Sequence, residues 1–366
     1  MAVKSSTVDV RAALQSAGAH YMNLIEFGIL KVFIDHQIFD HIPAEGSISV
    51  TDLATRTKAE VSLLQRFSDY LVASEVLASP APHELAHTTR SLSYRSEEIA
   101  AGFVSHVYHF FLRPMATWTA YFEENGLREP KDAKTIPLGL ATGHPEEDLY
   151  GVLDKEPRLA YMFNVAQARS AAIFPMKGLY DFAWLREALE DHIGAESPAI
   201  VDIGGSHGLA LKELLAENPF IPSKRCAVLD FPQTVEQAQQ NLDEDLRDIH
   251  FIGGSMLEPL PVALHAAGIY QFRRVLSDFV DKDIILALEQ VRRVCAPYSR
   301  VLIIEELVKA SRDKFAIAQD ISVLNFGGKR RSEADWHQLA SQAGLQVRHV
   351  FEQTETAFAV VELGLA

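Results

Sequence analysis

The sequence predicts an α/β protein: a Rossmann-like, doubly wound sheet preceded by an all-α, winged-helix N-terminal region. From Ala199 onward, short runs rich in β-forming residues alternate with helical segments, which is typical of a parallel sheet with crossover helices. The first of these runs leads into a glycine-rich turn at Gly204. Before Ala199, apolar residues recur mainly at helical spacing.

The N-terminal segment from Val8 to Leu77 is predicted to be helical, with one helix beginning at Ser49 as its N-cap. Ser79-Pro80-Ala81-Pro82 interrupts this pattern, and we expect a short extended piece from Thr88 to Tyr94. A winged-helix unit is the fold that this order indicates. Its recognition region, Thr55 to Lys58, holds only two basic residues, so we interpret the unit as a dimerisation domain and not as a DNA reader.

The middle segment, from Ile99 to Leu189, is helix-rich and aromatic, and we expect it to roof an apolar pocket. The glycine turn should open a helix from Leu209 to Glu217, and the sheet should end in an antiparallel edge. The predicted strands are Ala199 to Ile203, Cys226 to Leu229, His250 to Ile252, Ala267 to Phe272, Val301 to Glu305, Gln346 to Phe351 and Ala357 to Glu362.

Composition limits the functional classes. The 366 residues carry a formal charge of -15, which argues against nucleic acid and anionic membranes as partners. No signal pattern and no apolar run long enough for a bilayer is present, so we expect a cytoplasmic protein acting on a small molecule. The two cysteines, Cys226 and Cys295, are too few for a disulfide framework or a Cys-based zinc site. We therefore expect buried thiols and no bound metal.

Four strand ends supply candidates for a nucleotide-type ligand, because ligands bind beyond the carboxyl ends of parallel strands. The first is the turn that follows Asp202, with Gly204, Gly205 and Gly208. The second is Asp230, a carboxylate placed to accept from a ribose diol, followed by Phe231, which could flank a purine. The third is Gly253-Gly254-Ser255-Met256, and the fourth leads to Arg273, Arg274, Ser277 and Asp278. Spacing alone leaves a dinucleotide possible.

Three motifs at successive strand ends, VDIGGSHG from Val201, LDFP from Leu229 and GGSM from Gly253, resemble those of the small-molecule O-methyltransferases of the caffeate and hydroxyindole type. The similarity spans nearly the whole chain and includes Phe163-Asn164 and the segment from Asn325 to Lys329. It implies a homodimer with the class I methyltransferase fold that binds S-adenosyl-L-methionine at Gly204, Asp230, Phe231 and Met256.

The resemblance also implies a domain division and a substrate pocket. Residues 1–100 would be the winged-helix-like dimerisation domain, and residues 101–366 would hold the helical roof and the cofactor-binding catalytic domain. The residues expected to line the substrate pocket are Phe163, Asn164, Gln167, Phe174, Met176 and Asn325.

Two positions in the cofactor site depart from the family pattern. Where relatives have an Asp to hold the adenine amino group, this chain has Ser255, and where they have a Lys, it has Arg273. We still expect cofactor binding.

The catalytic positions depart further. In the resembled family a His before an Asp removes the acceptor's proton, oriented by two Glu residues. Here Ser277 stands at the His position and Arg330 replaces one Glu, while Glu305 matches the other. Two coordinated replacements favour different chemistry: dehydration or pericyclic reaction of a polyketide-derived, pyridone-type intermediate, as in a fungal subset of this fold. Arg330, Asp278, Arg273 or Arg274, and one of His106 and His109 would then activate the substrate.

Two alternatives stay open. In the first, the chain is a true O-methyltransferase of an acidic phenolic or enolic hydroxyl, with Asp278, His106 or His109 as the base. In the second, the chain is a catalytically inactive binding subunit. His106 and His109, three residues apart on one expected helix face, could instead only pack in a helix interface. Asp278 could instead cap the helix that begins near Asp281.

Overall fold

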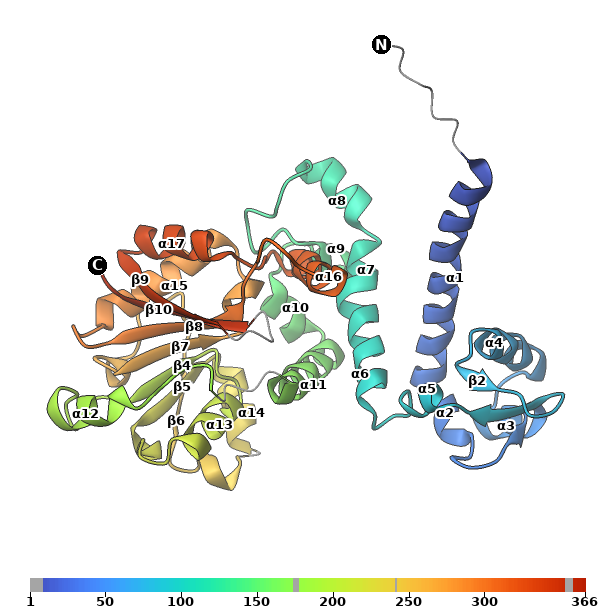
Figure 1. Cartoon of the computed structure of the whole chain (residues 1–366), viewed down its shortest axis with the longest axis horizontal. Coiled ribbons are helices and arrows are strands. Elements are labelled where there is room, and N and C mark those ends of the chain that lie inside the picture. The colour runs from blue at the N-terminus through green and yellow to red at the C-terminus, as the bar shows by residue number, and fades with distance from the viewer. Residues whose placement is uncertain (1–8, 174–177, 241, 353–357) are drawn as a thin grey trace, which may run out of the picture. The chain divides into compact units, whose positions relative to one another are not determined.

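The computed structural model describes residues 9–173, 178–240, 242–352 and 358–366, with only the backbone for 167–173 (Figure 1). Contacts within the chain divide it into two compact units. The first contains the residues up to Leu112 together with Tyr161–Ala166, and the second contains Arg113–Ala160 together with the chain from Gln167 onward.

The first unit is helical with a small antiparallel sheet in the order β1-β3-β2. Its core is an apolar cluster that includes Phe33, Phe39, Leu53 and Leu71. Ser49 caps the third helix as predicted, because its hydroxyl accepts from the amide of Asp52. The elements are α1 (Val10–Asp35), α2 (Ile38–His41), β1 (Ile48–Ser49), α3 (Val50–Thr57), α4 (Val61–Ala73), β2 (Leu77–Ala78), β3 (Glu84–His87), α5 (Thr89–Leu92), α6 (Ile99–His106) and the π-helix η1 (Val107–Leu112).

The extended piece predicted from Thr88 to Tyr94 is wrong. The strand of the wing is β3, which ends at His87, and Thr88 is the N-cap of the short helix α5. Thr88 and Ser91 cap each other's backbone amides in a capping box, a local device that favours a helix over continuation of the strand.

The segment that carries the two roof histidines does not form one regular α-helix. Helix α6 ends at His106, and Val107–Leu112 is π-helical, which is rare and often found at functional sites. His106 lies against the rings of Phe110 and Phe111, and His109 lies against Tyr108. The simple α-helical spacing that placed both histidines on one face is therefore interrupted between them.

The second unit contains a seven-stranded sheet in the order β6-β5-β4-β7-β8-β10-β9 (Figure 1). The five strands from β6 to β8 are parallel, and β10 runs antiparallel between β8 and β9. The predicted fold class, including the antiparallel edge, is confirmed. The strands are β4 (Ile200–Ile203), β5 (Cys226–Asp230), β6 (His250–Gly253), β7 (Ile269–Arg273), β8 (Arg300–Glu306), β9 (Leu345–Glu352) and β10 (Phe358–Leu365).

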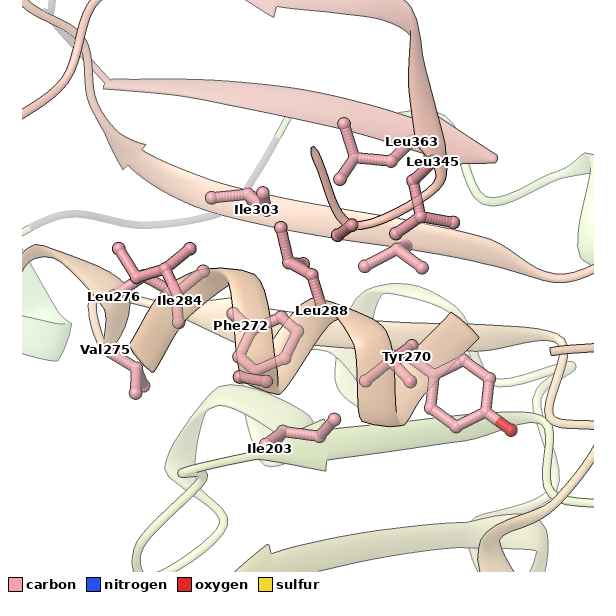
Figure 2. Packing of buried hydrophobic residues seen from close by; sticks show 14 of the residues in the cluster. Ile203, Tyr270, Phe272, Val275, Leu276, Ile284, Leu288, Ile303, Leu345 and Leu363 are labelled. Atoms are coloured by element: carbon pink, nitrogen blue, oxygen red, sulfur yellow. The ribbon is translucent and has the colours of Figure 1, made fainter. Parts of the chain in front are cut away.

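Helices cover both faces of this sheet. On one face, Ile284 and Leu288 of α15 pack in a core with Phe272 and Ile303 (Figure 2). Trp336 of α17 belongs to the same core. On the other face α12 and α13 pack against alternate residues of the same strands. The helices are α7 (Arg113–Met115), α8 (Trp118–Asn125), α9 (Pro137–Thr142), α10 (Leu149–Lys155), α11 (Pro157–Ile173, shared with the first unit), α12 (Trp184–Asp191), α13 (Leu209–Glu217), α14 (Pro232–Gln240), α15 (Asp281–Val294), α16 (Lys314–Val323) and α17 (Glu333–Gln342).

Helix α13 spans the residues that the sequence predicted, beginning after Gly208 in the left-handed conformation. Because the five strands β6, β5, β4, β7 and β8 run parallel, their carboxyl ends lie at the same end of the sheet. Among the described helices, none has both the length and the apolar character needed to cross a membrane.

Candidate active site

The turn after β4 is built around Asp202, a carboxylate enclosed by the protein. Asp202 is 1% exposed, and neither of its carboxylate oxygens has a hydrogen-bond partner among the described residues. A Cβ at Gly205 would lie 2.5 Å from Asp202 Oδ2, and one at Gly204 would lie 2.7 Å from Val275. Only glycines allow the backbone this close. The turn packs tightly against a buried acid, and the amides of Gly204 and Gly208 donate to the carbonyl oxygens of Leu229 and Gly205 at 2.8 and 2.9 Å.

Burial raises the pKa of Asp202 to about 6, although the Gln271 amide and the Arg273 guanidinium oppose the increase. A buried acid without partners is costly to ionise. A cationic or N–H-bearing ligand at the turn would add to the stabilisation that Gln271 and Arg273 already give the ionised form.

Asp230 closes the second side of this turn. Its Oδ2 accepts from the amide of Ser206 at 2.8 Å, and its Oδ1 accepts from the amide of Phe231 at 2.7 Å. Burial raises the pKa of Asp230, against these two amide bonds. The side chain of Thr234 also bonds to this carboxyl. Because a carboxylate offers about four lone-pair sites, it can still accept from a ligand hydroxyl.

Ser255, Met256 and Arg273 occupy the next two strand ends. The Ser255 hydroxyl accepts from the amide of Leu257 at 3.2 Å, which leaves its own proton available to donate. Met256 is partly buried against the main core. Arg273 is 9% exposed and pairs with Glu213 of α13 at 3.0 Å, so part of its guanidinium is already used within the protein.

Glu305 holds the backbone that leads to Ser277. This buried residue of β8 accepts from the amide of Leu276 at 3.0 Å and from the amide of Ser277 at 3.3 Å. Burial raises its pKa, while Arg274 is the largest of the influences that lower it. The Glu matched by sequence therefore fixes the short 3₁₀ turn Leu276–Asp278.

Asp278 is half-buried in this turn. Burial and, next, the charge of Glu305 raise its pKa to about 7, while Arg274 and Arg330 oppose the increase. Helix α15 has Val280 as its N-cap without a side-chain bond, so Asp278 is not the cap of that helix.

Arg330 is engaged on both its side chain and its backbone. Its guanidinium pairs with Glu306, and its amide donates to Asp320 Oδ1 at 3.0 Å. Asp320 in turn accepts from Arg312 at 2.6 Å. The charge reversal noted in the sequence is thus accompanied by two acidic partners.

The segment that precedes Arg330 packs directly on the Leu276–Asp278 turn. A Cβ at Gly328 would collide with the carbonyl oxygen of Ser277 and lie 2.8 Å from the Cα of Asp278. Asn325 is fully buried, and its Oδ1 accepts from the indole of Trp118 at 2.8 Å.

Tyr150 of α10 was missed by sequence reasoning. Its ring lies 5.1 Å from that of Phe231 and is stacked 5.7 Å from that of Phe279. Burial raises its pKa well above the usual value, and the charges of Asp278 and Asp230 raise it further. Tyr150 thus connects the Asp230 side of the site with the Asp278 side. No motif marks it, because the contact depends on how α10 packs on the sheet.

The remaining predicted residues lie in the first unit or outside the described side chains. In the first unit, Phe163 is buried and packs 5.7 Å from Phe110, and Asn164 is half-buried. The side chain of Gln167 and all of Phe174 and Met176 lie outside the described residues. Among the residues that are described, no group of three His, Cys, Asp or Glu side chains could hold a metal ion.

Comparison with known proteins identifies the family. The profile of the O-methyltransferase domain matches residues 147–346, and that of the O-methyltransferase dimerisation domain matches residues 20–106. The chain belongs to the O-methyltransferase family. Among the relatives of this O-methyltransferase family member, methyltransferase pynC of Aspergillus niger is 40% identical and methyltransferase fsa4 of a Fusarium species is 33% identical. The matches cover 95% of this chain and 96% of pynC, and 94% of each chain for fsa4.

Solved structures share its fold. OxaC in complex with SAH and oxaline has a TM-score of 0.85 at 24% identity, covering 98% of this chain and 88% of OxaC. A structure described as a pericyclic reaction enzyme has a TM-score of 0.79 at 19% identity, covering 99% of this chain and 91% of that one. At these identities the likeness shows a common fold.

The cofactor of this O-methyltransferase family enzyme is S-adenosylmethionine, as the sequence predicted. The site fits that group: a buried acid lies against a turn in which added side chains would clash, and a second carboxylate, Asp230, binds the same turn.

Proposed function

We propose that this enzyme transfers the methyl group of S-adenosylmethionine to a heteroatom of a small molecule of secondary metabolism, and that Asp278 accepts the acceptor's proton. The observation that carries the proposal is the carboxyl of Asp278, whose pKa is raised to about 7 next to Ser277. A base works best when its pKa lies near the operating pH. Ser277 does not ionise near neutral pH, so the adjacent acid replaces the family's His.

The surrounding charges support this role for Asp278. Arg274 and Arg330 are the two cations that lower its pKa, and Arg330 is itself paired with Glu306. Burial and the charge of Glu305 outweigh these two cations, so the pKa of Asp278 stays raised. A carboxyl in that position exchanges a proton near neutrality more readily than a salt-bridged one.

The acceptor is a group with an acidic proton. An Asp of this pKa is too weak to ionise an ordinary alcohol, but it suits a phenolic or enolic hydroxyl. The family name favours oxygen as the methylated atom, and the names of pynC and fsa4 support methyl transfer without specifying the atom.

We assign the cofactor to the glycine turn and its two neighbouring carboxylates, formed by Asp202, Gly204, Gly205, Gly208 and Asp230. Phe231, Ser255, Met256 and Arg273 would complete that site. When bound there, S-adenosylmethionine supplies an electrophilic methyl group on a sulfonium. The chain's own part is to orient the acceptor and to take its proton at the carboxylate of Asp278, with Tyr150 excluding water between the two halves of the site.

A second candidate, cofactor-dependent dehydration or pericyclic cyclisation without methyl transfer, is favoured by Ser277 and Arg330 at positions where the family has His and Glu. Against it, the guanidinium of Arg330 is already paired with Glu306. A paired guanidinium is a weaker donor to a developing oxyanion than a free one. The names of the relatives also favour methyl transfer.

The enzyme is proposed to act as a homodimer through its first unit. The support is the match to the dimerisation domain and a set of exposed apolar side chains on α1. These side chains are Val10, Leu14, Tyr21, Met22, Leu24 and Ile25. Light scattering coupled to size exclusion tests the dimer.

The function is tested on the metabolite that accumulates when the gene is inactivated in its producing organism. Purified enzyme and S-adenosylmethionine should convert it to a product heavier by one CH₂, with one S-adenosylhomocysteine released per product. Conversion to an isomer, or to a product lighter by one water, with the cofactor unconsumed would establish the second candidate instead. Failure of the protein to bind S-adenosylmethionine in calorimetry would support an inactive subunit.

A further inference from the structure

Arg331, the residue after Arg330, is buried and fully engaged in the second unit. It is 2% exposed. Its Nη1 donates to the carbonyl oxygens of Leu276 at 3.2 Å and Lys329 at 2.8 Å. Its Nη2 donates to the carbonyl oxygen of Phe279 at 2.8 Å and, with Nε, to Asp281 Oδ1 at 2.7 and 2.9 Å.

Two of these carbonyl groups bracket the turn that contains Ser277 and Asp278. The same turn is held from its amide side by Glu305, which accepts from Leu276 and Ser277. A buried anion therefore binds the N–H groups of the turn while a buried cation binds its C=O groups. Charge-assisted bonds of this kind are stronger and more directional than bonds between neutral groups.

The backbone and the guanidinium of Arg331 are themselves held by other parts of the second unit. Its carbonyl oxygen accepts from the amide of Val308 at 2.9 Å, just beyond β8, and its guanidinium lies 5.7 Å from the ring of Trp336. The strand that supplies Glu305 and the residue that supplies the guanidinium are thus joined through the backbone. The backbone of the turn is therefore held on both its amide side and its carbonyl side, which restricts its movement.

We infer that Arg331 is a positioning residue for the reaction: with Glu305 it fixes the Leu276–Phe279 turn so that the carboxylate of Asp278 meets the acceptor. The inference rests on the proposed function for its effect on rate. Its effect on the turn is independent of that function. A displacement of about 1 Å at a reacting group can cost on the order of 100-fold in rate.

The test compares Arg331→Lys with Asp281→Asn. Lysine keeps the charge but cannot reach three carbonyl oxygens and Asp281 at once, whereas Asp281→Asn removes the ionic partner and leaves the carbonyl bonds. We expect Arg331→Lys to lower kcat by about 10- to 100-fold with little change in KM for the cofactor. It should also move the pH midpoint of the rate, because the surroundings of Asp278 change. Asp281→Asn should retain kcat within about threefold, because the bonds from Arg331 to the carbonyl groups of the turn remain.

Hydrogen exchange supplies a readout that does not need activity. In Arg331→Lys the amides of residues 276–279 should exchange at least about tenfold faster, while peptides from β4 and β7 keep their protection. Arg331→Gln, a planar donor without charge, serves if the lysine variant does not fold. Unchanged exchange in the turn together with an unchanged pH midpoint would overturn the inference. Suppose that the turn exchanges faster in Arg331→Lys but the wild-type enzyme transfers no methyl group. Arg331 would then still be the residue that holds the turn, and only the proposed function would be refuted.

Discussion

Arg330 pairs with Glu306, the residue that follows Glu305 on β8. Both side chains are largely buried, with 13% and 11% exposed. Removing one member of such a pair leaves an uncompensated charge, whereas exchanging both preserves the attraction. The arginine at 330 is therefore part of a matched pair and not an isolated charge reversal.

From this pair we expect Arg330→Glu to lower the free energy of unfolding by about 3 kcal/mol, since it places two acids together in a buried site. Glu306→Arg should have a similar effect. The double exchange should recover most of the loss in urea unfolding. Additive losses in the double variant would show that the two side chains do not interact.

Ser255→Asp should tighten binding of S-adenosylmethionine by about tenfold, because a carboxylate accepts a stronger hydrogen bond from an amino group than a hydroxyl does. Calorimetry with the cofactor alone measures the change. Ser255→Ala is the matched control and should weaken binding only slightly. Tighter binding by the alanine variant would argue against this position as a cofactor contact.

Asp202→Asn should weaken cofactor binding by at least about tenfold, since a buried ionised acid loses its charge. In the wild type, binding should weaken as the pH falls below about 6, because the pKa of Asp202 is raised to about 6 and its protonated form has lost the charge. The asparagine variant should lack that pH dependence. An identical pH dependence in both proteins would place the titrating group elsewhere.

Tyr150→Ala should reduce kcat by about 10- to 100-fold, because it removes the ring that lies between Phe231 and Phe279. Tyr150→Phe keeps that packing and should lose less than about tenfold if the hydroxyl only excludes water. Tyr161→Phe, at a tyrosine that is 70% exposed, is the control. Equal losses in the alanine and phenylalanine variants would assign the effect to the hydroxyl.

The sequence predicted the elements that local patterns determine. The strand before Asp202, the turn and helix α13 follow from β-forming residues, glycines and helical periodicity in one stretch. The extended piece after Thr88 was wrong because a capping box between Thr88 and Ser91 outweighs the strand-forming threonines.

The parts of the site that could not be predicted depend on contacts between distant segments. Tyr150 reaches Phe231 and Phe279 only through packing, and the Glu306 partner of Arg330 lies 24 residues earlier in the chain. Likewise, nothing in the sequence around Arg331 indicates that its guanidinium binds the carbonyl groups of a turn some fifty residues away. The sequence shows that residues 330 and 331 are positively charged, but it does not show which groups the two guanidinium groups bind.

The most direct measurement of the central claim is the pH dependence of the single-turnover rate of methyl transfer for the wild type and Asp278→Asn, with Ser277→Ala as control. If Asp278 is the base, the wild-type rate rises with pH and levels off above about 7, where the carboxyl is ionised. Asp278→Asn should be slower by about 100-fold or more and should lose that rise with pH. Ser277→Ala should keep both the wild-type rate and its rise with pH. A wild-type rate and an unchanged profile in Asp278→Asn would contradict the account.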